Sequence, residues 1–298
     1  MTAFLSFLSY LATWAGQPEA ARPLLVDQRD APYEQRVRVV RFPERPDVTL
    51  PARSHAALPD LITMLAARVH VFMVGPSGSG KSTLAGQAAD ALGLSLYAVS
   101  LGPTTPTSKL FGFRSAGGEY VRTPFREAYE HGGVMLIDEL DNGHPGLVAE
   151  LNQALANEHG AFADGMVDAH DDFRLVATGN TYGLGPDRRF VGRNQLDAAT
   201  LDRFALLQVP IDERLEERLT LAAAADLSRP AKREAKRWLE EVRRTRERVA
   251  AAGINVVVSP RAAIEGARLL AAGMDYEAVC EARLLGNLDA ATRAKLVS

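Results

Sequence analysis

The chain has 298 residues, of which 47% are hydrophobic and 24% are charged, which describes a soluble globular protein of one large or two ordinary domains. The net charge of −3 gives no overall attraction to nucleic acid or to anionic membranes, although a local basic patch stays open. The single cysteine, Cys280, excludes an internal disulfide and favours a reducing compartment, so we expect a cytoplasmic protein.

The first part of the chain predicts an N-terminal extension at residues 1–54. Residues 3–11 are apolar but too short to cross a bilayer, and no basic residue lies in or before them. We expect an amphipathic helix docked on the protein or on a neighbour, rather than a membrane-surface helix. A linker rich in Pro, Ala and Asp is predicted at residues 17–34, and residues 36–40 and 47–50 predict a short hairpin.

The most informative stretch follows an apolar run at residues 69–74 and fits G-x-x-x-x-G-K-[ST], with a helical pattern after it. Its glycines permit close backbone approach and positive φ, and the helix presents its positive end to the same anion. We expect Lys81 to reach the β- and γ-phosphates and the Ser82 hydroxyl to bind Mg²⁺. The predicted nucleotide-binding residues are Gly75, Pro76, Ser77, Gly78, Ser79, Gly80, Lys81, Ser82 and Thr83.

Strand and helix patterns alternate after this loop, which predicts an α/β fold with a mainly parallel, covered sheet. The predicted strands are residues 69–74, 94–99, 134–137, 173–178 and 206–209. The predicted helices are residues 84–92, 124–131, 146–157 and 196–204. Two hairpins are expected at residues 110–121 and 160–172, the second turning at Asp164-Gly165. Beyond residue 212 the pattern is helical, so we expect a nucleotide-binding core at residues 55–212 and a lid domain at residues 213–298.

An acidic pair, Asp138-Glu139, ends the buried strand at residues 134–137. We expect Asp138 to bind Mg²⁺ through water, because Mg²⁺ keeps part of its hydration shell. Glu139 is placed to polarise the attacking water, since phosphoryl transfer asks mainly for positioning and charge stabilisation. A purely structural pair is the alternative, and the phosphate-loop motif upstream favours the catalytic one.

Three further side chains are candidates for catalysis. An amide at Asn180, after the next strand, can orient water against the γ-phosphate, although Asn is also common in turns. The guanidinium of Arg203 suits a phosphate that gains charge in the transition state, and the alternative is a surface salt bridge with Asp202. Arg261 follows Ser259, which we expect to cap a helix, so it can reach the nucleotide from the helical domain.

The motifs GPSGSGKS, VMLIDE, ATGN, LDRF and SPRA, in this order over about residues 55–275, resemble those of the MoxR-type AAA+ ATPases. The segments TGNTYGLG and LDAATLDRF are most similar to the cobaltochelatase ATPase-subunit-like group. The resemblance implies a five-stranded AAA+ core, a C-terminal α-helical lid, and a ring, usually a hexamer, with ATP sites between subunits. It also implies that Arg203 is an arginine finger for the neighbouring site, Asn180 the first sensor and Arg261 the second.

The chain departs from this group in two places. Where many members have Asp-Glu-x-Asn-Arg, residues 138–142 are Asp-Glu-Leu-Asp-Asn and lack the basic residue. The loop that follows Asn180 is unusually basic, so Arg188, Arg189 or Arg193 could share the role of Arg203.

The resemblance implies a Mg²⁺-dependent ATPase that remodels a protein partner, one with a von Willebrand A-like domain, through hairpins at the ring pore. We expect no membrane partner. The alternatives are a nucleic-acid or defence motor similar to the McrB-type restriction GTPases, and a nucleotide-switched scaffold that turns over slowly. ATP rather than GTP follows from the resemblance alone. The basic helical segment at residues 231–250 predicts a solvated lid helix, with a nucleic-acid-binding face as the alternative.

Overall fold

The computed structural model describes residues 24–27, 38–42, 45–51, 53–186, 190–224 and 229–297, which belong to two units, Met1–Ala52 and Arg53–Ser298. In the first unit, an antiparallel sheet has the order β1 (Leu24–Asp27), β2 (Arg38–Phe42), β3 (Arg45–Thr49). β2 and β3 correspond to the predicted hairpin, whereas β1 lies within the predicted linker, because a short apolar run there pairs with β2. The helix predicted at residues 3–11 lies outside the described residues.

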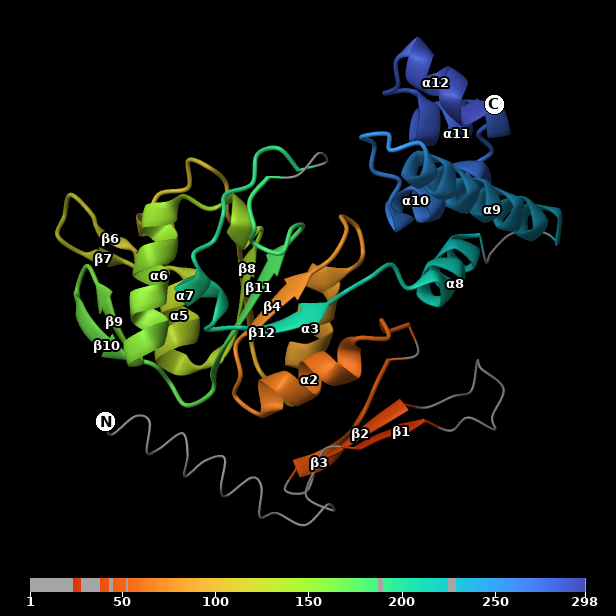
Figure 1. The fold of residues 1–298 in the computed structure, drawn as a ribbon. Coiled ribbons are helices and arrows are strands. Elements are labelled where there is room, and N and C mark those ends of the chain that lie inside the picture. Colours follow the sequence, from red (N-terminus) through yellow and green to blue (C-terminus); the bar gives the residue numbers. More distant parts are fainter. Residues whose placement is uncertain are drawn as a thin grey trace. The chain divides into compact units, whose positions relative to one another are not determined.

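A five-stranded sheet lies at the centre of the second unit (Figure 1). Its strands are β4 (Val71–Val74), β5 (Leu96–Ser100), β8 (Gly133–Asp138), β11 (Phe173–Gly179) and β12 (Ala205–Gln208). All neighbours are parallel, in the order β12-β4-β11-β8-β5, which confirms the predicted fold class. Because β11 lies between β4 and β8, the carboxyl ends of these three strands meet at one edge, where open parallel sheets bind ligands.

Helices cover both faces of this sheet, with α2 and α3 on one face and α5, α6 and α7 on the other (Figure 1). Their bounds are α2 Leu58–Ala66, α3 Lys81–Leu92, α5 Pro124–His131, α6 Pro145–Asn157 and α7 Ala198–Leu201. Since both faces are covered, β11 is buried along its whole length. The helix predicted at residues 196–204 is only the short α7: it begins after the Asp197 carboxylate, which accepts from the Ala199 N–H at 2.9 Å, and it ends before a turn at residues 202–204 that leads into β12.

Two small hairpins project from the core. β6 (Phe113–Arg114) and β7 (Tyr120–Val121) form the first, but the predicted hairpin residues before them belong to the short helix α4 (Ser108–Phe111). Leu110 and Phe111 are buried in the hydrophobic core, which favours this helix over an extended strand. β9 (His159–Phe162) and β10 (Gly165–Asp168) form the second hairpin, whose turn at residues 163–164 is one residue earlier than predicted.

The C-terminal part is helical, as expected. It comprises α8 Glu213–Ala223, α9 Arg229–Ala251, α10 Pro260–Ala271, α11 Tyr276–Cys280, the π-helical turn η4 Glu281–Leu285 and α12 Ala290–Val297. Its core surrounds the fully buried Trp238, whose indole N–H donates to the Ala262 and Ala263 carbonyls at 3.2 and 3.1 Å. Gly266 permits this packing, because a Cβ there would lie 2.2 Å from the Trp238 ring. Within the described part of the chain, none of the helices combines the length and apolar character that crossing a membrane requires.

Candidate active site

The phosphate-loop motif lies between β4 and α3, as its sequence predicts. Gly78 and Gly80 have φ of 78° and 96°, a region that favours glycine. Gly75 is required for a different reason, because a Cβ there would lie 2.0 Å from the Val209 carbonyl oxygen. The glycines therefore set a turn that brings the loop close to the neighbouring backbone, with the first turn of α3 directly after it.

Lys81 is buried at the start of α3, with its ammonium group directed back at the loop. Its Nζ donates to the carbonyl oxygens of Gly75 and Pro76 at 2.8 and 3.2 Å, and to Oδ1 of Asn180 at 3.2 Å. Burial lowers the Lys81 pKa to about 8, against the opposing attraction of nearby carboxylates, Asp138 foremost. All three partners are neutral oxygens, so a phosphate would offer the ammonium a stronger, charged acceptor.

Asp138, at the end of β8, lies beside the hydroxyl of Ser82 on α3. The Ser82 Oγ donates to Oδ2 of Asp138 at 3.3 Å, and the Thr178 hydroxyl on β11 donates to Oδ1. Among the described residues, no group of three or more His, Cys, Asp or Glu side chains is placed to hold a metal. Two neighbouring hard oxygen donors instead fit Mg²⁺, which takes one or two protein ligands and completes its octahedron with water and phosphate.

Glu139 follows directly and adopts a left-handed backbone conformation, with φ 61° and ψ 47°. Its backbone N–H donates to the Thr178 hydroxyl at 3.0 Å. Its carboxylate accepts from Arg193 at Oε1, at 3.1 Å, and from the Asn142 amide at Oε2, at 3.4 Å. The side chain is 38% exposed, so water can reach it beside the phosphate loop.

Asn180 is held at the end of β11 by the buried carboxylate of Asp141. Oδ2 of Asp141 accepts from the backbone N–H groups of Asn180 and Thr181 at 3.3 and 3.2 Å, and from the Thr181 hydroxyl at 2.9 Å. Oδ1 of Asp141 accepts from Arg193 at 3.0 Å. The structure thus brings Lys81, Asn180 and the acidic strand end together at one edge of the sheet.

No sequence motif marks Asp141 or Thr178 as a functional residue, and the sequence predicts Arg193 only as a contributor to a neighbouring site. The departure from Asp-Glu-x-Asn-Arg was the one available signal that the surroundings of Glu139 differ. This departure does not indicate which residue contacts Glu139, because Arg193 lies 54 residues further along the chain. Arg188 and Arg189 lie outside the described residues.

Arg203 does not face the site of its own chain through any described contact. Its guanidinium donates to the backbone carbonyls of Asn152 and Ala199 at 3.3 and 2.5 Å. Among the described ion pairs there is none with Asp202, which was the structural alternative. The candidate finger therefore lies beside α6 and α7.

Arg261 lies in the first turn of α10, next to the phosphate loop. A Cβ on Gly78 would lie 2.8 Å from Cβ of Ser259 and 3.6 Å from Cγ of Arg261. Ser259 stands at the N-cap position, but its side chain makes no capping hydrogen bond, contrary to the sequence prediction, since it packs against the loop instead. The first turn of α10 thus brings Arg261, a residue of the C-terminal helical part, next to the phosphate loop.

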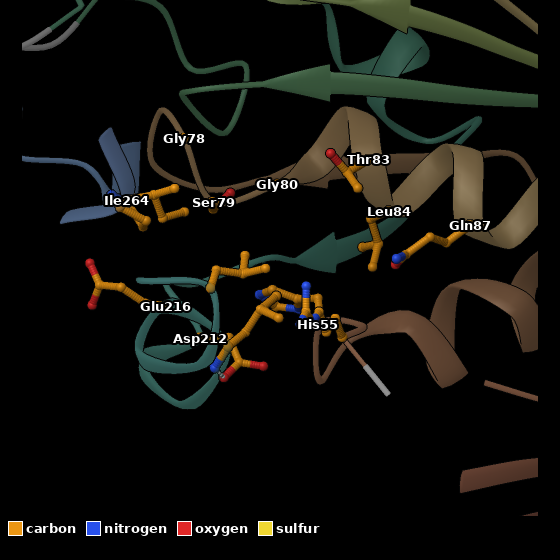
Figure 2. A pocket seen from close by; sticks show the side chains of 14 residues that line it. His55, Gly78, Ser79, Gly80, Thr83, Leu84, Gln87, Asp212, Glu216 and Ile264 are labelled. Atoms are coloured by element: carbon orange, nitrogen blue, oxygen red, sulfur yellow. Dashed lines mark hydrogen bonds between the residues drawn. The ribbon is translucent and has the colours of Figure 1, made fainter. Parts of the chain in front are cut away.

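A cavity of about 300 Å³ opens beside the phosphate loop, between Gly78–Gly80 and helix α8 (Figure 2). Its apolar lining suits the faces of a purine base; the residues concerned are Leu84, Leu215, Leu219, Pro260 and Ile264. His55 and Asp212 border it, and they are fixed by contacts with the Pro210 carbonyl and the Ala56 N–H, both at 2.9 Å. Apart from Gly78–Gly80 of the phosphate loop, no sequence motif marks this cavity, because its other walls come from distant segments.

This fold and this site together define a P-loop nucleoside triphosphatase domain with a helical lid. Residues 70–204 match the family model described as the AAA domain of the dynein-related subfamily. Together with the motif order, this match and the CobS relative reported below support the resemblance to the MoxR-type AAA+ ATPases seen in the sequence.

Curated relatives match about half of the chain. It is 29% identical over 189 residues to the aerobic cobaltochelatase subunit CobS of Sinorhizobium sp, covering 54% of this chain and 57% of that protein. It is 27% identical over 169 residues to the uncharacterized protein YojN of Bacillus subtilis, covering 53% of each. The matched region thus spans only somewhat more than half the length of either relative.

Solved structures with a similar fold include two further proteins. A point mutant of Thermotoga maritima RuvB has a TM-score of 0.49 and 19% identity, covering 79% of this chain and 71% of that one. A putative ATPase from Cytophaga hutchinsonii has a TM-score of 0.44 and 17% identity, covering 74% of both chains.

Proposed function

We propose that this AAA+ ATPase works as a Mg²⁺-dependent, ring-forming motor, which uses ATP hydrolysis to remodel or activate a protein partner. One observation supports the ATP chemistry above all others. Nζ of Lys81 lies 3.2 Å from Oδ1 of Asn180, and Oγ of Ser82 lies 3.3 Å from Oδ2 of Asp138. Four side chains, from the start of α3 and from the ends of β8 and β11, therefore converge at the end of the phosphate loop.

Each side chain has a role in this proposal. The loop N–H groups and Lys81 bind the β- and γ-phosphates, and Ser82 and Asp138 hold Mg²⁺. The metal, when bound, neutralises charge on the phosphate oxygens. Glu139 accepts a hydrogen bond and then a proton from the attacking water, and Asn180 orients that water with its amide. The apolar cavity beside the loop receives the purine base.

The position of Arg203 supports the proposed ring. Its guanidinium binds backbone carbonyls outside the site of its own chain, as expected of a residue that serves the neighbouring site. The loop after β11 supports a subunit contact as well, because Leu184 and Val191 are 74% and 77% exposed. A mixed-ring experiment tests this arrangement: Arg203→Ala and Glu139→Gln subunits, each inactive alone, should regain activity when mixed. No recovery at any ratio would contradict a role in trans.

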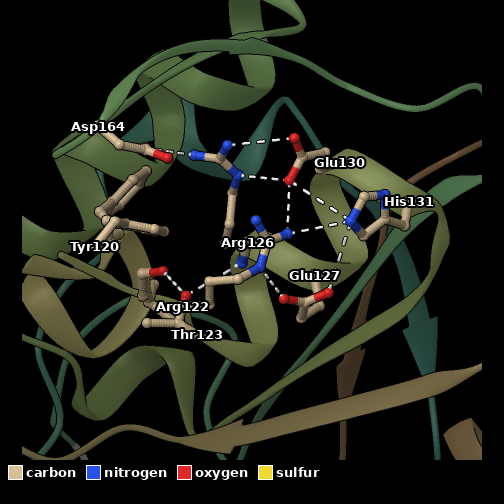
Figure 3. A network of polar contacts seen from close by, with 10 residues as sticks. Tyr120, Arg122, Thr123, Arg126, Glu127, Glu130, His131 and Asp164 are labelled. Atoms are coloured by element: carbon tan, nitrogen blue, oxygen red, sulfur yellow. Dashed lines mark hydrogen bonds and ion pairs between the residues drawn. The ribbon is translucent and has the colours of Figure 1, made fainter.

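The two hairpins are the surface that we propose for the partner. Phe113 and Met166 are exposed on them, and a network around Arg126 connects them with α5 (Figure 3). Arg126 donates to Glu130 on its own helix at 3.0 Å and to Asp164 in the β9–β10 turn at 2.8 Å. Arg114 of the first hairpin donates to the Ala163 carbonyl of the second at 3.0 Å. The hairpins are therefore joined, and we expect them to move together.

The partner class follows from the relatives alone. CobS is named as a subunit of an aerobic cobaltochelatase, and by analogy we propose a protein partner with a von Willebrand A-like domain. Capture with the Glu139→Gln protein and ATP tests this, since ATP that cannot be hydrolysed should keep the complex assembled. Retention of a von Willebrand A-like protein with ATP but not without nucleotide is the expected result, and its absence from the retained material would contradict the proposal.

A nucleic-acid motor of McrB type is the weaker candidate. Three of the basic side chains of α9 that suggested it make contacts within the lid: Arg243 and Arg246 pair with the buried carboxylate of Glu216, and the Arg237 guanidinium lies 4.5 Å from the centroid of the Tyr276 ring. These contacts favour a structural role for that helix face. Stimulation of turnover by DNA, or a preference for GTP over ATP, would favour the nucleic-acid motor; turnover near zero in the assembled ring would favour a nucleotide-switched scaffold.

A further inference from the structure

The guanidinium of Arg193 joins the two carboxylates that follow β8. One terminal nitrogen lies 3.1 Å from Oε1 of Glu139, and the other lies 3.0 Å from Oδ1 of Asp141. The Arg193 side chain is 11% exposed and that of Asp141 is fully buried. Arg193 comes from the loop after β11, so this contact joins two separate segments at the catalytic edge of the sheet.

The Asp141 end of this contact is fixed. Its carboxylate also accepts from the Asn180 and Thr181 backbone and from the Thr181 hydroxyl. The neighbouring Asn194 adds two bonds, from its N–H to the Asp141 carbonyl at 2.7 Å and from its side chain to the Gly143 carbonyl at 2.8 Å. A buried carboxylate with this many donors keeps one geometry, and Arg193 is held with it.

The Glu139 end has more freedom. Glu139 is 38% exposed, and apart from Arg193 the one partner of its carboxylate among the described residues is the Asn142 amide, at a long 3.4 Å. An exposed Glu samples several rotamers, whereas the planar fork of Arg fixes a carboxylate oxygen at a defined position. Because Arg193 binds Oε1, the weakly held Oε2 stays available to accept a hydrogen bond from water.

We propose that Arg193 is a positioning residue, which orients the Glu139 carboxylate of its own subunit toward the attacking water. This inference rests on the proposed role of Glu139 as the group that accepts the proton. The segment after β8 supplies no Lys or Arg for the task, since residues 140–144 are Leu-Asp-Asn-Gly-His. The same contact connects Glu139 through Asp141 to the Asn180 turn, so both catalytic strand ends share one network.

Substitution of Arg193 tests the inference. Arg193→Ala should lower kcat on the order of 10²-fold, the loss that a misplaced catalytic group brings, while the affinity for a fluorescent ATP analogue stays within about twofold. Arg193→Lys should give an intermediate kcat, because an ammonium keeps the charge but cannot bridge two carboxylates as a fork. Arg68→Ala, which removes an exposed surface arginine, is the matched control and should leave both values unchanged.

Mixed rings separate a role within the subunit from a role in trans. Arg193→Ala mixed with Glu139→Gln should show no recovery, whereas Arg203→Ala mixed with Glu139→Gln should recover. Recovery of activity in the first mixture would overturn the inference. A wild-type kcat in Arg193→Ala or Arg193→Lys would also overturn it, and so would loss of analogue binding in Arg193→Lys. If Glu139→Gln itself keeps wild-type turnover, the proposed function fails too; an inactive Glu139→Gln beside a fully active Arg193→Ala refutes the positioning role alone.

Discussion

The ammonium nitrogen of Lys81 lies 3.2 Å from the amide oxygen of Asn180, although 99 positions separate the two residues in the sequence. The order of the sheet explains this proximity, because β4 and β11 are parallel neighbours and both residues follow their carboxyl ends. A γ-phosphate bound by Lys81 would therefore lie within reach of the Asn180 amide. The contact supports the proposal that Asn180 detects the state of the nucleotide.

The Lys81 pKa predicts how nucleotide affinity depends on pH. Burial lowers this pKa from 10.5 to about 8, so the nucleotide-free protein loses the Lys81 proton as the pH rises through about 8. ATP binding favours the ammonium, so affinity should be full below pH 8 and should fall above it by up to about tenfold per pH unit. Titration with a fluorescent ATP analogue between pH 7 and 9.5 measures this.

The control for that titration is Lys81→Arg, whose guanidinium keeps its charge throughout this pH range. Its affinity will be weaker at every pH, because the fork does not fit the ammonium site, but its pH profile should be flat. An equal decline in both proteins above pH 8 would show that another group titrates. Lys81→Ala should lose nucleotide binding, and unchanged affinity there would refute the phosphate-loop assignment.

Asp141 should matter for stability as well as for activity. Asp141→Ala leaves Arg193 without its buried partner and leaves three donors around Asn180 and Thr181 unsatisfied. Removing one member of a buried pair costs about 3–5 kcal/mol, and we expect a loss of this order in urea unfolding. Asp202→Ala removes an exposed aspartate and should change stability by less than about 0.5 kcal/mol. Similar values for the two variants would contradict the network.

Arg126 should hold the second hairpin against α5. Its side chain is buried, lies 4.5 Å from the Phe162 ring centroid, and pairs with Glu130 and Asp164. Arg126→Ala should therefore free the β9–β10 turn, and limited proteolysis should cut there several-fold faster than in the wild type. Arg68→Ala is again the surface control and should not change the cleavage rate. Cleavage of the turn at the wild-type rate in Arg126→Ala would show that Arg126 does not restrain it.

The sequence alone predicts those parts of the fold and of the site that local patterns encode. The phosphate loop and the acidic pair Asp138-Glu139 follow from motif and strand pattern, and the parallel sheet follows from the alternation of strands and helices. The sequence predicts a linker where β1 lies, since a four-residue strand is recognisable only from its partner β2. Likewise, the helix predicted at residues 196–204 is shorter, because the Asp197 cap starts it at Ala198 and a turn at residues 202–204 ends it before β12.

The surroundings of the site could not be predicted for a related reason. The contact of Arg193 with Glu139 and Asp141 joins positions more than 50 residues apart, and no periodicity in either segment marks it. The burial of Asp141 could not be predicted either, because an Asp in a polar segment after a strand is typical of an exposed turn. Contacts of this kind depend on the order of the strands in the sheet, which the sequence pattern does not give.

The steady-state ATPase rate of Glu139→Gln, measured together with its affinity for ATP, tests the central claim most directly. The account predicts that the variant binds ATP as tightly as the wild type and that its kcat is lower by on the order of 10²- to 10⁴-fold, the contribution of a positioned base. A kcat within twofold of the wild type at equal affinity would contradict the assignment of this carboxylate and of the site built around it.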